Sequence, residues 1–326
     1  MRSTGMALAA SGGNAAAGGT PAGPLDRVVT LLTIQARALL LPAGPASAMA
    51  AAPATATASL PAGAATPPAT PPPSNPPAQA TLAEFAAALA ASGQQRLKDA
   101  ETADGGMARL LAASGTGQLL AAEQLGAPAA PVPGGQAQEG QSEEGQAQDG
   151  KLPPSGEVTA AGPGSTEPAG ASACPATPAA GSISVGAALA ATAEAELEAV
   201  YGYQAALTRL PPEGARPASD FLAQHQDLAD QAAAYSLMHC GTPSPQPPGY
   251  VLDPEFLDAP AAGLARLEAA TLPVYGDIVA ITGSTTRAWA LSALQGAARR
   301  AQHWGADANP LPGLLLDEAQ LPQLPA

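Results

Sequence analysis

Hydrophobic residues recur every three or four positions through most of residues 183–304, which is the pattern of helices with one buried face. Pro211 and Pro212 interrupt the pattern, and Gly241 and Pro243 interrupt it again, as expected at helix ends. The pattern predicts four helices, at about residues 184–210, 216–240, 260–282 and 285–304.

The connections between these helices favour a bundle with one crossover. The first and third connections are short, whereas the second, TPSPQPPGYVLDPEF at residues 242–256, is long and rich in proline. Short connections join antiparallel neighbours, and a long one lets the chain return to the opposite end of a bundle. The expected fold class is therefore all-α, with residues 183–304 forming a four-helix bundle.

Two further helices are predicted within residues 81–126. Thr81 and Glu84 have the spacing of a capping box at the start of the first helix. The second helix is expected to begin after Asp104. Two helices with few large side chains are marginally stable alone, so we expect a helical hairpin that docks elsewhere on the molecule.

The remaining segments contain few large apolar side chains. The chain has 35 glycines, 36 prolines and only 3% aromatic residues, and alanine dominates its hydrophobic fraction. We predict a disordered, low-complexity region at residues 1–80, which includes a candidate short helix at residues 25–41. Residues 127–182 are expected to be a disordered acidic linker rich in Gly, Gln and Pro, and residues 305–326 an extended tail.

The charge of the chain excludes some classes of partner. Its formal net charge is −14, from 27 acidic and 13 basic residues. Nucleic-acid-binding proteins carry basic patches, so no nucleic-acid partner is expected. No stretch reaches the roughly 20 apolar residues of a spanning helix, so no direct membrane span is expected.

A candidate signal segment favours export to the cell envelope over a cytoplasmic location. Arg27 precedes the apolar run VVTLLTI, which Gln35 and Arg37 interrupt before the small residues PASAMA. Two cysteines, Cys174 and Cys240, are too few for a disulfide framework. An oxidising compartment would allow one disulfide between them, but we interpret them as two unrelated thiols.

One carboxylate is predicted to point into the bundle. Because a helix advances about 100° per residue, Glu196 falls in the middle of the apolar stripe of the first bundle helix. Glu194 and Glu198 fall on the opposite, solvent side. A buried carboxylate is costly unless it is paired, protonated or bound to a cation. Glu196 is therefore the leading candidate for chemistry.

Two other side chains are expected to face the same interior. His225 lies on the apolar stripe of the second helix, and Glu268 lies at the edge of that of the third. Glu196, His225 and Glu268 form a candidate site for one metal ion, iron or manganese, with open coordination positions. A turn near residue 213 would place His225 opposite Tyr201, roughly 7 Å along the helix from Glu196. The favoured alternative is a buried hydrogen-bond network that fixes the register of the bundle.

The motifs of a complete two-metal site are missing. Such sites need Glu-x-x-His pairs, but Leu222, Ser236 and Arg300 stand three positions before the three histidines, His225, His239 and His303. The fourth helix carries no carboxylate, and His303, Arg299 and Arg300 are expected on its polar side. The sequence also lacks a P-loop, GxGxxG and GxSxG, which disfavours an enzyme.

Four segments resemble an uncharacterised branch of the ferritin-like superfamily from high-GC bacteria: ALAATAEAELEAVYGYQAAL, HQDLADQ, RLEAATLPVYGDI and AARRAQHW. In that branch a glutamate of the first helix precedes a tyrosine pair, as Glu196 precedes Tyr201 and Tyr203 here. The resemblance spans roughly residues 81–126 and 185–316. It implies a ferritin-like four-helix bundle with an N-terminal helical hairpin, and little about activity, because the branch is known mainly as a domain of unknown function.

Three functional hypotheses remain. The favoured one is a non-enzymatic structural or interaction module, with an unknown protein partner or a homo-oligomer as its assembly. The second is a degenerate metal-binding or oxidative ferritin-like protein that uses Glu196, His225 and Glu268. The third is a carrier of an apolar ligand inside the bundle, suggested by the small residues of the fourth helix.

Overall fold

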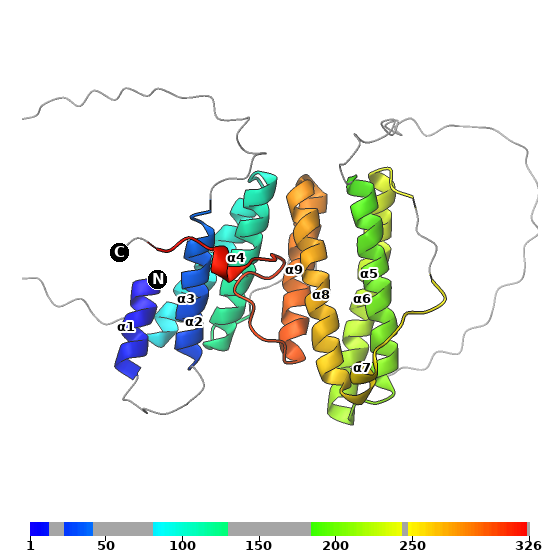
Figure 1. Ribbon diagram of the computed structural model, residues 1–326, viewed down its shortest axis with the longest axis horizontal. Coiled ribbons are helices and arrows are strands. Elements are labelled where there is room, and N and C mark those ends of the chain that lie inside the picture. The colour runs from blue at the N-terminus through cyan, green and yellow to red at the C-terminus, as the bar shows by residue number, and fades with distance from the viewer. Residues whose placement is uncertain (13–22, 42–80, 130–183, 243–246, 325–326) are drawn as a thin grey trace, which may run out of the picture.

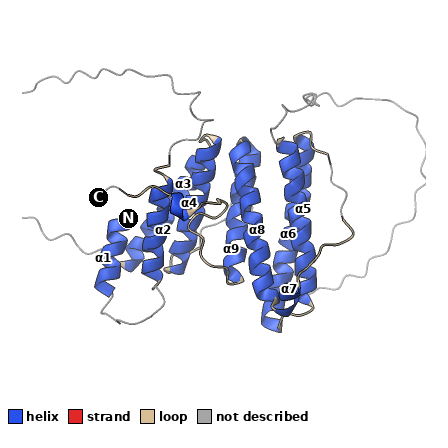
Figure 2. Cartoon of the chain, in the orientation of Figure 1, coloured by secondary structure: helices blue, strands red, loops and turns tan. Residues whose placement is uncertain are grey.

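The computed structural model describes residues 1–12, 23–41, 81–129, 184–242 and 247–324, and within these ranges the chain forms helices and loops (Figure 2). Residues 13–22 and 42–80 of the predicted low-complexity region, and residues 130–182 of the linker predicted at residues 127–182, lie outside the described residues. The helices are α1 (Arg2–Gly12), α2 (Pro24–Ala38), α3 (Leu82–Ala100), α4 (Gly105–Gln124), α5 (Val185–Leu207), α6 (Pro212–Met238), α7 (Pro254–Asp258), α8 (Pro260–Ile281) and α9 (Ser284–His303). The predicted all-α fold class is confirmed.

Helices α5, α6, α8 and α9 form the bundle. Helix α5 pairs with α6, α8 pairs with α9, and α5 packs against α8. The connection from α6 brings the chain back to the opposite end of the bundle, where the short helix α7 precedes α8 (Figure 1). The four predicted helices are thus confirmed to within a few residues, and their connectivity includes the expected crossover.

The hairpin of α3 and α4 docks on the bundle, as the sequence predicts. The α8–α9 pair lies between this hairpin and the α5–α6 pair (Figure 1). The capping box at Thr81 is present, since Glu84 N donates to Thr81 Oγ1 at 3.2 Å and Thr81 N donates to Glu84 Oε2 at 2.8 Å. Arg287 of α9 holds the end of α3 and the loop after it, because its Nη1 donates to the Ala100 carbonyl at 3.3 Å and to the Ala103 carbonyl at 2.8 Å.

The N-terminal region differs from the expectation of disorder. Residues 2–12 form α1, and the candidate helix at residues 25–41 is α2. Buried Val28 and Leu31 of α2 pack with Phe85 of α3 in one apolar cluster. The amphipathic stripe of α2 is short, but the hairpin provides an apolar surface that covers it. The predicted disorder is therefore wrong for α1, whereas the candidate helix at residues 25–41 is confirmed as α2.

The C-terminal tail is mostly extended, as predicted, but includes a 3-10 helix at Glu318–Gln320, and it connects distant helices. Gln35 Nε2 of α2 donates to the Pro310 carbonyl at 2.8 Å and to the Ser114 carbonyl at 3.1 Å. Arg109 of α4 donates from Nε and Nη2 to the Gly313 carbonyl, at 3.0 and 2.9 Å. The tail is thus fixed to both α2 and α4 by hydrogen bonds to its backbone.

Cys240 follows α6 and is disulfide-bonded, so the interpretation of this residue as an unrelated thiol is wrong. The other cysteine of the chain, Cys174, lies outside the described residues. None of the helices in the described ranges combines the length and hydropathy that crossing a bilayer requires.

Candidate functional site

Four buried polar side chains meet inside the bundle, one from each of its helices. Glu196 comes from α5, His225 from α6, Glu268 from α8 and Arg300 from α9. The first three are fully buried, and Arg300 is 3% exposed. Each lies on the face of its helix that also carries the buried apolar residues, so the amphipathic packing of the helices turns all four inward.

His225 lies between the two carboxylates. Its Nδ1 is 2.6 Å from Glu196 Oε2, and its Nε2 is 2.8 Å from Glu268 Oε1. Only the imidazolium form donates from both nitrogens, so this geometry fits a positively charged ring. The histidine therefore links α6 to α5 on one side and to α8 on the other.

Arg300 provides the second cation. Its Nε donates to Glu268 Oε1 at 2.9 Å and to Oε2 at 3.0 Å. With His225 protonated, two cations face two carboxylates, and the formal charge of the cluster is zero. The Nη2 group of Arg300 is also buried, and it has no hydrogen-bond partner among the described residues.

Two tyrosines complete the hydrogen bonding of the glutamates. The Tyr275 hydroxyl donates to Glu196 Oε1 at 2.5 Å, and the Tyr203 hydroxyl donates to Glu268 Oε1 at 2.6 Å. Trp304 Nε1 donates in turn to the Tyr203 hydroxyl at 2.7 Å. We call these seven residues the buried network: Glu196, Tyr203, His225, Glu268, Tyr275, Arg300 and Trp304.

The network determines which of its groups are charged. Burial opposes charge on His225, but hydrogen bonds from its ring to Glu196 and Glu268 outweigh burial, so the pKa of His225 lies above its ordinary value. Burial likewise opposes charge on Glu268, but the Arg300 charge and the His225 hydrogen bond hold the pKa of Glu268 below its ordinary value. Both groups are therefore stabilised in their charged forms.

Arg300 and the two tyrosines of the network keep their protons. Burial would lower the pKa of Arg300, but the charges of Glu268 and Glu196 raise it above its ordinary value. Burial and the neighbouring glutamate charges raise the pKa of both Tyr203 and Tyr275. Both hydroxyls therefore remain hydrogen-bond donors over the physiological pH range.

The predicted offset between His225 and Glu196 is wrong. The loop between α5 and α6 lies at residues 208–211, whereas the prediction placed the turn near residue 213. The earlier turn brings His225 level with Glu196. Tyr201, the residue expected opposite His225, is instead 37% exposed and its ring contacts that of Tyr250 at 5.8 Å.

The solvent-facing positions predicted for Glu194, Glu198 and His303 are confirmed. Glu194 and Glu198 are exposed, on the opposite side of α5 from buried Glu196. His239 is the C-terminal cap of α6, and its Nε2 lies 2.9 Å from Thr286 Oγ1 at the start of α9. His303 is exposed, and its ring contacts the ring of Trp304 at 4.9 Å.

The prediction of a polar side for Arg300 is wrong, and Arg300 is the functional residue that the sequence interpretation missed. Helix α9 carries alanines around most of its circumference, so its buried face has little contrast in hydropathy. The balance of buried charges predicts the inward position of Arg300 better than hydropathy does. Two inward carboxylates require buried cations, and α9 is the bundle helix with arginines and no carboxylate.

As they are hydrogen-bonded here, the network residues bind one another and leave no ligand atom directed at a shared metal position. Both ring nitrogens of His225 are bound to carboxylates, so neither has a lone pair directed at a shared metal position. The Arg300 guanidinium contacts both oxygens of Glu268, where it would repel a metal cation. Within the described ranges, no group of three or more His, Cys, Asp or Glu residues is arranged to hold a metal. Whether Glu196, His225 and Glu268 bind a metal ion is a prediction that measurement of the metal content of the protein would test.

Comparison with known proteins identifies one similarity. A family model described as a domain of unknown function (DUF4439) matches residues 188–315. The match covers nearly all of α5, all of α6 to α9 and the first part of the tail, and so includes every residue of the buried network. No curated protein and no solved structure matches the chain.

Proposed function

We propose that α5 to α9 form a ferritin-like bundle that acts as a non-enzymatic structural or interaction module. The single crossover between two antiparallel helix pairs supports the ferritin-like assignment. One observation carries the functional proposal: His225 and Arg300 supply the positive charge that the buried carboxylates need. In this proposal, protein cations take the place that metal ions have in metal-binding bundles.

Burial of the network also supports a structural role. Glu196, His225 and Glu268 have no exposed surface, so a substrate has no path to them in this conformation. The hydrogen bonds of His225 to Glu196 and Glu268 join three helices. Moving one of these helices by a turn along its axis would break them. Buried ionic networks are best attested as devices that specify register. We infer that the network aligns α5, α6, α8 and α9 in one register.

The proposal extends to compartment and partner. We propose that the protein is exported to the cell envelope, because disulfides persist mainly in oxidising compartments and Cys240 is disulfide-bonded. Helix α2 contributes no support here, since its apolar run is packed against the hairpin. The proposed partner is another protein or a second copy of this chain, and the net charge of −14 disfavours nucleic acid.

Metal analysis with unfolding measurements tests the structural proposal. The full chain would be expressed with added iron and manganese, and metal per protein measured for the native protein, Glu196→Ala and the exposed control Glu198→Ala. We expect no stoichiometric metal in any of the three. We also expect Glu196→Gln to unfold at lower denaturant than the native protein. One equivalent of metal that Glu196→Ala loses and Glu198→Ala retains would overturn the proposal.

A degenerate single-metal protein remains the second candidate function. The observation that favours it is the convergence of Glu196, His225 and Glu268 within hydrogen-bonding distance of a single ring. The same metal analysis decides between the two, because the second candidate requires bound iron or manganese.

A further inference from the structure

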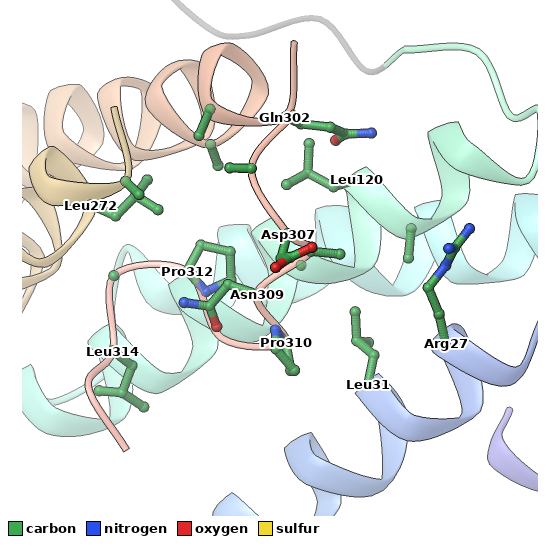
Figure 3. A pocket seen from close by; sticks show the side chains of 18 of the residues that line it. Arg27, Leu31, Leu120, Leu272, Gln302, Asp307, Asn309, Pro310, Pro312 and Leu314 are labelled. Atoms are coloured by element: carbon green, nitrogen blue, oxygen red, sulfur yellow. The ribbon is translucent and has the colours of Figure 1, made fainter. Parts of the chain in front are cut away.

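A pocket of about 620 Å³ lies on the opposite side of the α8–α9 pair from the α5–α6 pair. Helices α2, α4, α8 and α9 and the tail line it (Figure 3). None of the seven network residues lines it. The pocket is therefore separate from the buried network and from the proposed structural role.

The pocket has an apolar floor and a polar rim. Its buried lining residues are small or aliphatic, and include Val28, Leu31, Ala121, Leu272, Ala298 and Ala301. Its exposed lining residues include Arg27, Thr30, Gln124, Asp307 and Asn309. Figure 3 shows Arg27 on the opposite side of the pocket from Leu272 and Leu314. This division matches a ligand with an apolar body and a polar head.

The volume and lining of the pocket are those of a ligand site. Protein interiors contain few voids larger than a water molecule, and water is poorly held where polar partners are lacking. Pockets for small molecules measure roughly 300–1,000 Å³ and are mostly apolar with a few polar groups. The pocket here falls in that range at about 620 Å³.

The wall formed by the tail is held in place before any ligand arrives. Arg109 and Gln35 fix the backbone at Gly313 and Pro310. Gly117 allows α4 to approach this wall closely, since a Cβ there would lie 2.6 Å from the Pro310 carbonyl oxygen. A preformed wall lowers the entropic cost of binding.

The charges of the rim select the head group. Arg27 and Asp307 are the charged lining residues, and their formal charges cancel. Because one of these charges attracts and the other repels a head group of either sign, the rim gives a charged head no net attraction. The side-chain amides of Gln124 and Gln302 also line the pocket, and within the described ranges neither has a hydrogen-bond partner. The rim therefore favours an uncharged head that can form hydrogen bonds.

We propose that this pocket binds one uncharged amphiphile, with a single hydrocarbon chain and a hydroxyl- or amide-bearing head. The chain lies against the aliphatic floor, where burial of apolar surface drives binding. The head lies at the rim beside Gln124 and Gln302. The structural module thus also carries a neutral lipid.

Three probes with the same dodecyl chain length test the proposal on the full chain: 1-monododecanoylglycerol, dodecanoate and dodecylamine. Calorimetric titration below the aggregation limit of each probe would measure affinity and stoichiometry. We expect one equivalent of the monoacylglycerol to bind, at least tenfold more tightly than either charged probe. If the native protein does not bind the monoacylglycerol, for example because a segment of the chain fills the pocket, the proposal is overturned. Tighter binding of a charged probe would overturn the neutral head.

A matched pair of variants locates the bound probe. Ala269 lines the pocket and Ala270, its neighbour on α8, is exposed and does not. We expect Ala269→Trp to weaken binding at least tenfold and Ala270→Trp to leave it unchanged. Leu120→Glu, which places a carboxylate in the half-buried wall of α4, is a second blocking variant if Ala269→Trp unfolds. Native affinity in a folded blocking variant would contradict the site, whatever the metal analysis shows.

Discussion

The two sides of the α8–α9 pair differ in what fills the space beside them. On the side of α5 and α6, Glu268 and Arg300 contact each other in a buried interior, where Glu268 also contacts His225 and Tyr203. On the side of α2, α4 and the tail, Leu272 and Ala298 line a pocket of about 620 Å³. Positions close together on α8 and α9 therefore face either a charged interior or an apolar cavity.

The distribution of large side chains explains this difference. The chain is only 3% aromatic. Tyr203, Tyr275 and Trp304 all belong to the network, whereas the pocket lining contains no aromatic residue among the described positions. Small side chains let helices approach closely but leave volume unfilled where a loop forms one wall. Three of the ten aromatic side chains of the chain thus belong to the network, while alanines and glycines border the cavity.

The largest effect is expected from Glu268→Leu. This change leaves His225 and Arg300 buried without the carboxylate they share. Breaking a buried ion pair costs about 3–5 kcal/mol, measured as the loss in free energy of unfolding by denaturant. Glu198→Leu, at an exposed position on α5, is the control and should change this free energy by less than about 0.5 kcal/mol. A similar loss of unfolding free energy in the two variants would contradict the stabilising role of the buried network.

Arg300→Met should cost nearly as much, about 3 kcal/mol, because His225 alone then balances two buried carboxylates. The matched control is the adjacent Arg299→Met. Arg299 pairs with Glu123 of the hairpin at 2.7 Å, and both side chains are partly exposed. A partly exposed pair contributes about 1 kcal/mol or less. A greater loss of unfolding free energy for Arg299→Met than for Arg300→Met would contradict the role of Arg300.

Tyr203→Phe should cost about 1.5–3 kcal/mol, because its hydroxyl donates to charged Glu268 and accepts from Trp304. Chemical denaturation and the fluorescence of the tryptophans would report the change. Tyr201→Phe, two residues away and partly exposed, should have little effect. Equal effects of the two changes would show that the hydroxyl of Tyr203 has no special role.

Gly117→Ala tests the pocket side of the comparison. The added Cβ would lie 2.6 Å from the Pro310 carbonyl oxygen and displace the tail. We expect a loss of about 1–3 kcal/mol in unfolding stability, as for overpacking, and weaker binding of the monoacylglycerol. Gly106→Ala on the same helix meets nothing within 4 Å and should be neutral or slightly stabilising. A stable Gly117→Ala with native binding would show that the tail is not fixed as described.

The smallest and most specific effect is a pH dependence of stability. The raised pKa of His225 gives a contribution that is complete below its ordinary value of 6.5 and declines as pH rises through the raised pKa. The lowered pKa of Glu268 gives a contribution that is complete above its ordinary value of 4.5 and declines as pH falls. The network contribution should therefore be greatest between these two values. His225→Gln should remove the decline on the alkaline side, and an unchanged profile would contradict the charged ring.

The sequence predicted the helices and the convergence of Glu196, His225 and Glu268, because helical periodicity reports which face is buried. It misplaced His225 along the bundle, since axial alignment depends on where a loop turns and prolines mark that position only approximately. It missed the inward position of Arg300, because alanines surround α9 and mask its buried face. The pocket could not be predicted from the sequence, because its lining comes from four helices and the tail. These lining residues are up to 288 positions apart in the chain.

The tail also constrains the order in which the molecule can be completed during synthesis. Arg37 of α2 donates to the Leu321 carbonyl at 2.7 Å, across 284 positions of the chain. Contacts so distant in sequence form late, because loop closure precedes them. Helix α2 can therefore complete its hydrogen bonds only after residue 321 has left the ribosome. A nascent chain stalled earlier should expose α2 to proteolysis while α5 and α6 are already protected.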